Sequence, residues 1–183
     1  ASKKAFCAAA YIRWKLQDGT FWIRLICSKS RVSPLRKLSI PRLELQAAVM
    51  NSRLSQTVLE NTRLKFKQVF HLSDSGAVLA MIENGSATMK EFCGTRVAEI
   101  NSKTEKENWA WIGTQNNISD IGTRGAKPEE IGINSEWQGG PIWMKLPIDQ
   151  WPIDKTYREK IPEEEMPKIT SMAAKVVEVK LSL

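Results

Sequence analysis

The first thirty residues alternate between apolar and polar positions. The alternation covers residues 5–16 and 20–30, and the turn-forming dipeptide Asp18-Gly19 lies between them. A period of two is typical of a β-strand with one buried face, and Asp-Gly is a common hairpin turn. The pattern therefore predicts an antiparallel hairpin at the start of the fold, in which Trp14 and Trp22 face each other across the two strands.

The next segment has the spacing of an amphipathic helix. Within residues 42–60 the apolar positions recur at intervals of three and four, at Leu43, Ala47, Met50, Leu54 and Val58. Proline is well suited to the first turn of a helix, and Pro41 stands at this point. We expect a long helix that begins near Pro41, buries one apolar stripe and carries Glu44 in its first turn.

Shorter elements follow in alternation. The pattern predicts a buried strand at 65–74, a helix at 75–85, a second helix at 88–104, a strand at 108–114 and a loop that opens a helix at 117–125. The order β-β-α-β-α-α-β-α predicts an α/β fold in which the hairpin leads into a mixed, partly parallel sheet flanked by helices.

The composition changes after Gly125. We expect three parts: a domain at 1–127, an extension at 128–153 that packs on it, and a charged linker or tail toward a downstream domain at 154–183, with a short strand at 175–183. The extension is irregular and rich in Trp, Pro and Gly, with tryptophans at 137, 143 and 151 that are expected in the core.

Several classes of protein are disfavoured by composition. No apolar run approaches the roughly 18 residues that span a membrane. The three cysteines are far apart and the single histidine is His71, which argues against a zinc site and favours a reduced, intracellular protein. The chain starts without Met and without the apolar segment of a signal peptide, so we expect a piece of a longer chain.

Basic residues are concentrated in the first part of the chain. Residues 1–127 hold 20 Lys and Arg against 10 Asp and Glu, a net charge of +10. Residues 29–42 contain no acid and five basic residues: Lys29, Arg31, Arg36, Lys37 and Arg42. Such a run favours contact with a polyanion such as nucleic acid, and a solvated basic loop is the open alternative.

Three acids lie at the predicted boundaries of elements. Glu44 is near a helix start, Asp74 ends a strand, and Asp120 opens a helix. Carboxylates that converge repel each other unless a cation joins them, and oxygen ligands favour Mg²⁺ or Mn²⁺. Taken singly, each acid has an ordinary alternative: a helix-dipole contact for Glu44, and a helix N-cap for Asp74 and Asp120.

Five stretches together resemble the ribonuclease H region of BEL/Pao-type retrotransposon polyproteins. They are ASKKAF at 1–6, SKSRVSPLRKLSIPRLELQAAV at 28–49, LSDSGAVLAMI at 72–82, RVAEI at 96–100 and NNISDIGTRG at 116–125. The resemblance runs from Ala1 to about Trp151. It implies a ribonuclease H-like fold and a nuclease that hydrolyses the RNA strand of RNA–DNA hybrids with two Mg²⁺ ions, for which Mn²⁺ can substitute. It also implies a reverse transcriptase upstream, an integrase downstream and a cytoplasmic retroelement particle.

The resemblance also implies site residues. Glu44, Asp74 and Asp120 match catalytic, metal-binding acids of the family. Contacts to the hybrid are expected from Lys29, Arg31, Arg36, Lys37, Ser75 and Arg124. In this set Ser75 is a candidate for the 2′-hydroxyl that distinguishes RNA from DNA, with a helix-start role as its alternative. His71 does not match a family position and is expected to be structural.

One departure from the family pattern opens a second hypothesis. The family places its first acid, an Asp, directly before the stretch matched by residues 1–5, so that acid and much of the first strand are expected to be missing here. A catalytically inactive ribonuclease H-like scaffold that binds nucleic acid is therefore the main alternative. An integrase-like nuclease is a weaker one, because Asp74 and Asp120 are 46 residues apart and position 110, where a Glu would be expected 36 residues after Asp74, is Ala110.

Overall fold

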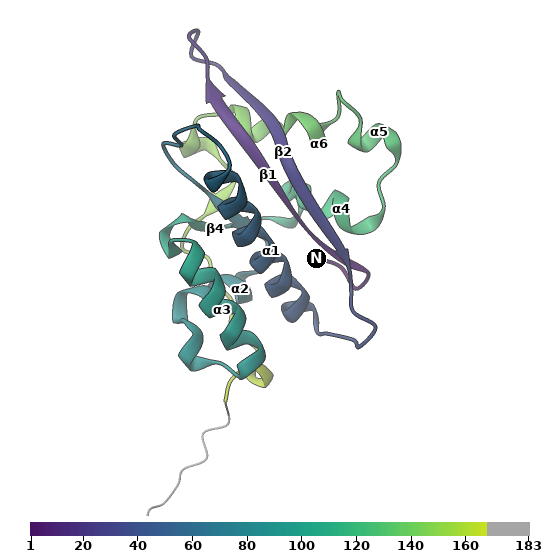
Figure 1. Cartoon of the computed structure of the whole chain (residues 1–183), viewed down its shortest axis with the longest axis vertical. Helices are drawn as coiled ribbons and strands as arrows, with labels where there is room; N and C mark the ends of the chain where they lie inside the picture. Colours follow the sequence, from purple (N-terminus) through teal and green to yellow (C-terminus); the bar gives the residue numbers. More distant parts are fainter. Residues whose placement is uncertain (168–183) are drawn as a thin grey trace, which may run out of the picture.

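The computed structural model describes residues 1–167, and the strand expected at 175–183 lies outside the described residues. The chain forms a mixed α/β fold (Figure 1). Its strands are β1 (Ala5–Lys15), β2 (Phe21–Val32), β3 (His71–Ser73), β4 (Trp109–Ile112) and β5 (Ile153–Asp154). Its α-helices are α1 (Ile40–Glu60), α2 (Gly76–Asn84), α3 (Glu91–Lys103), α4 (Ile121–Arg124), α5 (Pro128–Ile131) and α6 (Glu136–Gly139).

The predicted hairpin is confirmed. Strands β1 and β2 pair antiparallel over their whole length, with one shift of register between Ala10 and Tyr11. Trp14 lies opposite Trp22, and their ring centroids are 5.0 Å apart. Gly19 has a φ of +84°, a conformation that glycine adopts without the steric cost of a side chain, and this allows the turn.

The remaining strands form a second sheet. Strand β3 pairs parallel with β4, and β4 pairs antiparallel with β5, so the predicted partly parallel sheet is present. The expectation that the hairpin feeds this sheet is not met, because no described strand pairing joins β1–β2 to β3–β5. The strand expected at 65–74 is likewise formed only at 71–73, since no strand among the described residues pairs with 65–70.

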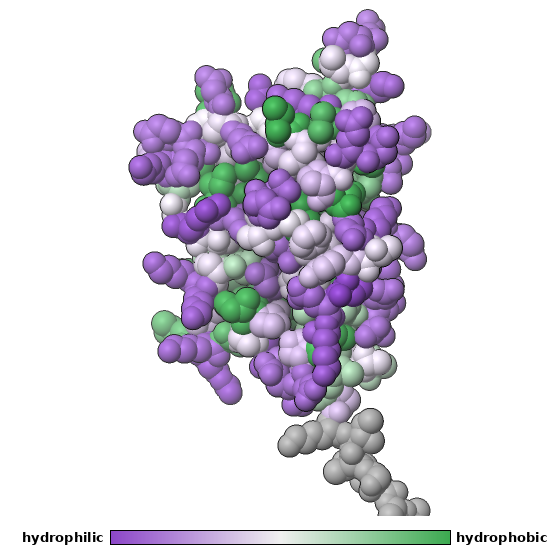
Figure 2. All heavy atoms as spheres, turned by 180° about the vertical axis from the view of Figure 1, so that it is seen from behind, coloured by the Kyte–Doolittle hydropathy of each residue, from purple (hydrophilic) through white to green (hydrophobic). Residues whose placement is uncertain are grey.

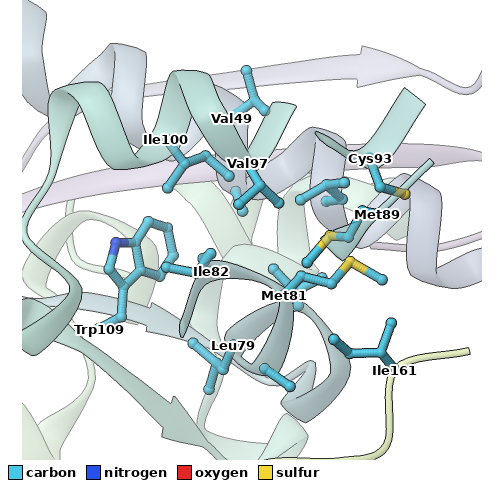
Figure 3. Close-up of a cluster of buried hydrophobic side chains, with 14 residues drawn as sticks. Val49, Leu79, Met81, Ile82, Met89, Cys93, Val97, Ile100, Trp109 and Ile161 are labelled. Carbon is cyan, nitrogen blue, oxygen red and sulfur yellow. The ribbon is translucent and has the colours of Figure 1, made fainter. Parts of the chain in front are cut away.

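Helix α1 lies between two cores and buries more than the predicted stripe. Leu43 and Met50 pack against Phe6 and Ala8 of β1. Another side of the helix carries Leu45, Ala48 and Val49 into a larger core, shown in Figure 3, that contains side chains of α2 and α3 together with Trp109 and Ile161. Val58, at the end of the predicted stripe, is only partly buried.

The hairpin is covered on its other face by the segment that follows α4. Figure 1 shows α1 on one side of the hairpin and α4 to α6 on the other. Trp137 and Trp143 are buried here, the Tyr11 hydroxyl donates to the Trp137 carbonyl at 2.8 Å, and the Arg13 guanidinium donates to the carbonyls of Met144 and Leu146. The face in Figure 2 is mainly hydrophilic, with apolar side chains visible in patches. Within residues 1–167, no helix has the length and apolar character needed to cross a membrane.

Candidate active site

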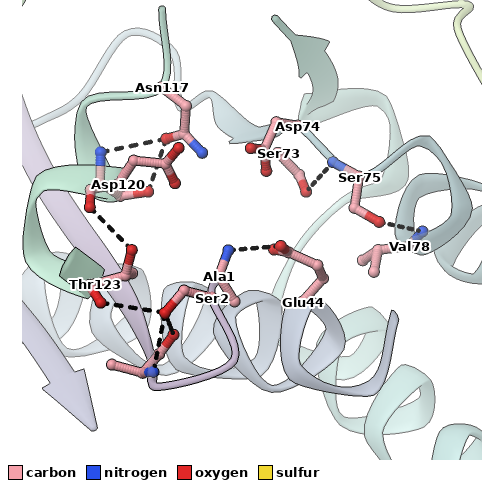
Figure 4. A network of polar contacts seen from close by, with 12 residues as sticks. Ala1, Ser2, Glu44, Ser73, Asp74, Ser75, Val78, Asn117, Asp120 and Thr123 are labelled. Atoms are coloured by element: carbon pink, nitrogen blue, oxygen red, sulfur yellow. Dashed lines mark hydrogen bonds and ion pairs between the residues drawn. The ribbon is translucent and has the colours of Figure 1, made fainter. Parts of the chain in front are cut away.

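Three acids that are distant in the sequence meet at one end of the hairpin. Glu44 is on α1, Asp74 directly follows β3, and Asp120 ends a short 3-10 turn (Ile118–Asp120) before α4. In Figure 4 their side chains are arranged around the amino group of Ala1. The expectation that Glu44 lies in the first helical turn is wrong, because α1 begins at Ile40 and Glu44 is its fifth residue.

Glu44 is the most enclosed of the three. Its Oε1 accepts a hydrogen bond from the Ala1 ammonium at 2.6 Å, and its side chain is 12% exposed. Burial raises the pKa of Glu44, the ammonium opposes that rise, and the nearby carboxylates of Asp74 and Asp120 raise the pKa further. The three acids therefore interact electrostatically although they come from separate elements.

Neighbouring residues keep the Asp74 carboxylate available. The N-cap of α2 is Ser75, whose Oγ accepts a hydrogen bond from the Val78 amide, so the alternative that Asp74 caps this helix is not what the structure shows. The Ser73 Oγ accepts from the Ser75 amide, and the Trp111 indole Nε1 donates to the Asp74 main-chain carbonyl at 3.2 Å. These bonds fix the backbone at the end of β3.

Asp120 is positioned in a similar way. Asn117 caps the preceding turn, because its Oδ1 accepts from the amide and the hydroxyl of Ser119. Asp120 stands before α4 but makes no side-chain capping bond. Burial raises the pKa of Asp120, as does the carboxylate of Asp74, whereas the Ala1 ammonium and Arg124 act in the opposite direction.

Close packing of α4 on β1 holds Asp120 in place. A Cβ on Gly122 would lie 2.4 Å from the Cys7 Sγ, so only glycine permits this approach. The Ser30 hydroxyl donates to the Gly122 carbonyl at 2.7 Å, and the Ser2 hydroxyl donates to the Thr123 carbonyl. Sequence reasoning did not find Gly122 or Ser2, because their roles arise from contacts across more than 90 residues.

The carboxylates of Glu44, Asp74 and Asp120 are suitable ligands for a hard cation, but they are not close enough together to form a metal site by themselves. Carboxylate oxygens are the ligands that Mg²⁺ prefers. Within residues 1–167, however, no three His, Cys, Asp or Glu side chains lie close enough together to hold a metal ion. The positive charge among the acids is supplied by the amino group of Ala1, so the three carboxylates alone do not fit the metal centre expected from the sequence.

Basic side chains border the same end of the hairpin. Lys29 and Arg31 lie opposite Ala8 and Phe6 in the β-ladder, a few residues from Ala1, and both are exposed. The loop after β2 carries Arg36 and Lys37, which are also exposed, and the exposed Arg124 closes α4. Arg42 is different, because its guanidinium pairs with Glu165 at 2.6 Å and 2.8 Å and is thereby engaged within the fold.

His71 has the surroundings of a structural residue. It is buried, its ring stacks on Trp109 with centroids 4.8 Å apart, and its Nδ1 is 2.8 Å from Asn51 Oδ1. Burial lowers the pKa of His71 to about 4.

The fold and the site together define a class. A mixed sheet with helices, in which acids from a strand end and from helices gather at one edge, is consistent with a ribonuclease H-like domain. Residues 1–75 match the family model of the Pao retrotransposon-like RNaseH-like domain. The match includes Glu44 and Asp74 and ends before Asp120. Comparisons with curated proteins and with solved structures give no match.

Proposed function

We propose that this chain is the ribonuclease H domain of a Pao-type retrotransposon polyprotein and serves hydrolysis of the RNA strand in RNA–DNA hybrids. The observation that carries the proposal is the gathering of Glu44, Asp74 and Asp120 around the amino group of Ala1. Three carboxylates without a cation would be unfavourable, so an edge of this composition favours binding of positive charge.

We further propose that the resident cations are two Mg²⁺ ions, for which Mn²⁺ can substitute. Any residue joined to Ala1 is attached at a nitrogen atom that lies 2.6 Å from Glu44. An Asp at that place would add a fourth carboxylate and would convert the Ala1 ammonium into an amide, so that Glu44 loses this charged partner. When bound, such ions supply Lewis acidity to the attacking water and to the leaving oxygen of a phosphodiester.

The remaining roles concern the substrate. Lys29, Arg31, Arg36, Lys37 and Arg124 would contact backbone phosphates, because they are exposed and border the acidic edge. Ser75 accepts a hydrogen bond in its capping role, which leaves its O–H group able to donate to a ribose 2′-hydroxyl.

The match of residues 1–75 to the Pao retrotransposon-like family model supports a proposal for the biological setting. We propose that the domain acts beside a reverse transcriptase and an integrase of the same polyprotein, within a cytoplasmic retroelement particle. Its task there would be to remove genomic RNA after DNA synthesis.

A second candidate is a nucleic-acid-binding scaffold without catalysis. It is favoured by the lack of three acids at metal-binding spacing within the described part of the chain. A scaffold of this kind would use the basic residues and leave the carboxylates without a role.

Cleavage of an end-labelled RNA–DNA hybrid in Mg²⁺ distinguishes the nuclease from the non-catalytic scaffold. The chain would carry one Asp joined to Ala1, with a single Ala at the same place as the matched control. We expect the Asp form to cut only the RNA strand, and Asp74→Asn to lower its rate by roughly 100-fold or more, since a charge-stabilising group is lost. Hybrid binding without cleavage by the Asp form would overturn the catalytic proposal in favour of the scaffold.

A further inference from the structure

After β5 the chain crosses the helices as a segment without strand or α-helix, residues 155–166, which we call the strap. The Asp154 side chain sets its direction, because Oδ1 accepts from the amides of Thr156 and Tyr157 at 2.7 Å and 3.0 Å. Further along, Ile161 lies in the larger core shown in Figure 3. The strap is therefore packed into the fold, and its contacts lead toward the acids at the end of the hairpin.

The far end of the strap is fixed to the start of α1. Glu165 is 1% exposed, and its two carboxylate oxygens accept from the Arg42 guanidinium at 2.6 Å and 2.8 Å. The Cys93 thiol donates to the same carboxylate, and the Lys90 amide donates to the Glu165 carbonyl at 2.8 Å. Because a bidentate pair holds both partners in one orientation, the strap ties α1 to the beginning of α3.

Arg42 is close to Glu44 in the helix but faces away from it. Each residue of an α-helix turns by about 100°, so side chains two positions apart lie about 200° apart around the axis. Arg42 accordingly faces the strap, whereas Glu44 faces the amino group of Ala1. The N-cap residue of α1, Ser39, makes no side-chain capping bond, so Arg42 supplies a polar anchor that the cap does not. The direction of Glu44 is therefore coupled to the strap.

The near end of the strap packs beside Asp74. The Tyr157 ring lies on Trp111 with centroids 4.5 Å apart, and the Trp111 Nε1 donates to the Asp74 main-chain carbonyl at 3.2 Å. Gly76 is the first residue of α2, and a Cβ there would lie 2.7 Å from Tyr157 Cε1 and 2.6 Å from Glu159 Cγ. The strap thus touches the main chain just after Asp74 and also the indole that binds its carbonyl.

We propose that the strap is a positioning element for Glu44 and Asp74. Glu165 acts through the guanidinium that it binds, and Tyr157 acts through the indole on which it stacks. Neither of these positioning residues bonds to the carboxylate of an acid in the described part of the chain. The inference rests on the proposed function, because the two acids need a fixed position only if they serve catalysis. It goes further by making the segment after β5 part of the nuclease unit.

Steady-state cleavage of the hybrid by the Asp form of the full chain tests the proposal. Glu165→Gln keeps the shape of the side chain but removes its charge, and Glu163→Gln is the matched control on an exposed pair of the same strap. We expect E165Q to lower kcat about tenfold, since small displacements of reacting groups are costly. Its KM should change less than about twofold, because the basic residues that hold the hybrid are untouched. E163Q should cleave like the parent.

A double-mutant cycle shows whether the effect passes through Arg42. Arg42→Gln alone should lower kcat about as far as E165Q does. The double variant should lose no more than either single variant, because the two side chains act as one unit. Losses that multiply in the double variant would overturn this route to Glu44.

A second pair of variants tests the near end of the strap. Tyr157→Phe keeps the ring on Trp111 and loses only the hydroxyl bond to Glu159, whereas Tyr157→Ala removes the ring. We expect Y157F to keep the parent kcat and Y157A to lower it about tenfold at unchanged KM. Equal kcat in Y157F and Y157A would overturn the role of Tyr157.

Hydrogen exchange on the chain without any added residue separates positioning from a general loss of stability. In E165Q, amides 43–47 of α1 should exchange at least about tenfold faster, while amides 6–14 of the hairpin keep their rates. Equal acceleration in both segments, or none in 43–47, would overturn the proposal. Cleavage by the parent that E165Q and Y157A fully retain would overturn the strap's role alone, whereas a parent that never cleaves would overturn the proposed function together with it.

Discussion

Asp74 and Asp120 can face the acidic edge because neighbouring side chains take over the capping of the elements beside them. Ser75 caps α2 and Asn117 caps the turn before α4. The sequence predicted that three acids stand at element boundaries, and it identified Ser75 as a candidate helix-start residue. It did not predict the contact of Ala1 with Glu44, because that contact depends on how separate segments fold onto each other.

At the same scale, His71 is expected to make stability depend on pH. Its folded pKa of about 4 is below the ordinary value of 6.5, so the unfolded chain binds a proton more readily. The stability that the neutral His71 side chain contributes to the folded state is fully present above pH 6.5 and is lost as pH falls from about 6.5 to about 4. The total loss is about 3 kcal/mol in the free energy of unfolding.

Urea unfolding at a series of pH values measures this effect. His71→Phe is the control, because a phenyl ring can stack on Trp109 but does not titrate. The loss of stability between pH 6.5 and 4 should be clearly smaller in H71F. Identical pH profiles for the two proteins would show that His71 is not the responsible group.

At the scale of elements, the contact between α4 and β1 positions one side of the site. Gly122→Ala would place a methyl group against the Cys7 side chain. We expect a loss of about 1–3 kcal/mol in unfolding free energy from overpacking, and a lower rate of hybrid cleavage in the Asp-extended chain because Asp120 is displaced.

Gly139 provides a matched control for this substitution. It also lies in a short helix, and a Cβ there would meet no atom within 4 Å. Gly139→Ala should leave both stability and cleavage nearly unchanged. If G122A behaved in the same way, the close packing of α4 on β1 would not be needed for the site.

The elements that could be predicted were those with a local signal. Periodicity and turn residues predicted the hairpin, α1 and a partly parallel sheet, and these were confirmed. The strand at 65–74 was predicted too long, because residues 65–70 line a cavity of about 740 Å³ and are in no described strand. The second buried side of α1 was missed because periodicity does not reveal that a helix is packed from two directions.

At the scale of the whole molecule, the segment after β5 closes the larger core. Ile161 joins that core, and the buried Glu165 pairs with Arg42 and accepts a bond from the Cys93 thiol. Composition predicted a charged linker or tail from residue 154, and the domain boundaries drawn from it stay a prediction. Arg42 and Glu165 are 123 residues apart, so no local pattern in the sequence indicates that they pair.

The proposal that Glu44, Asp74 and Asp120, together with an Asp joined to Ala1, bind cations at the end of the hairpin is tested most directly by Mn²⁺ binding followed by electron paramagnetic resonance. We expect the Asp-extended chain to bind Mn²⁺ at least about tenfold more tightly than its Asp74→Asn and Asp120→Asn variants. Binding should strengthen with rising pH, because the carboxyl pKa values of Glu44 and Asp120 are raised. Equal affinity in the parent and in both variants would contradict the account.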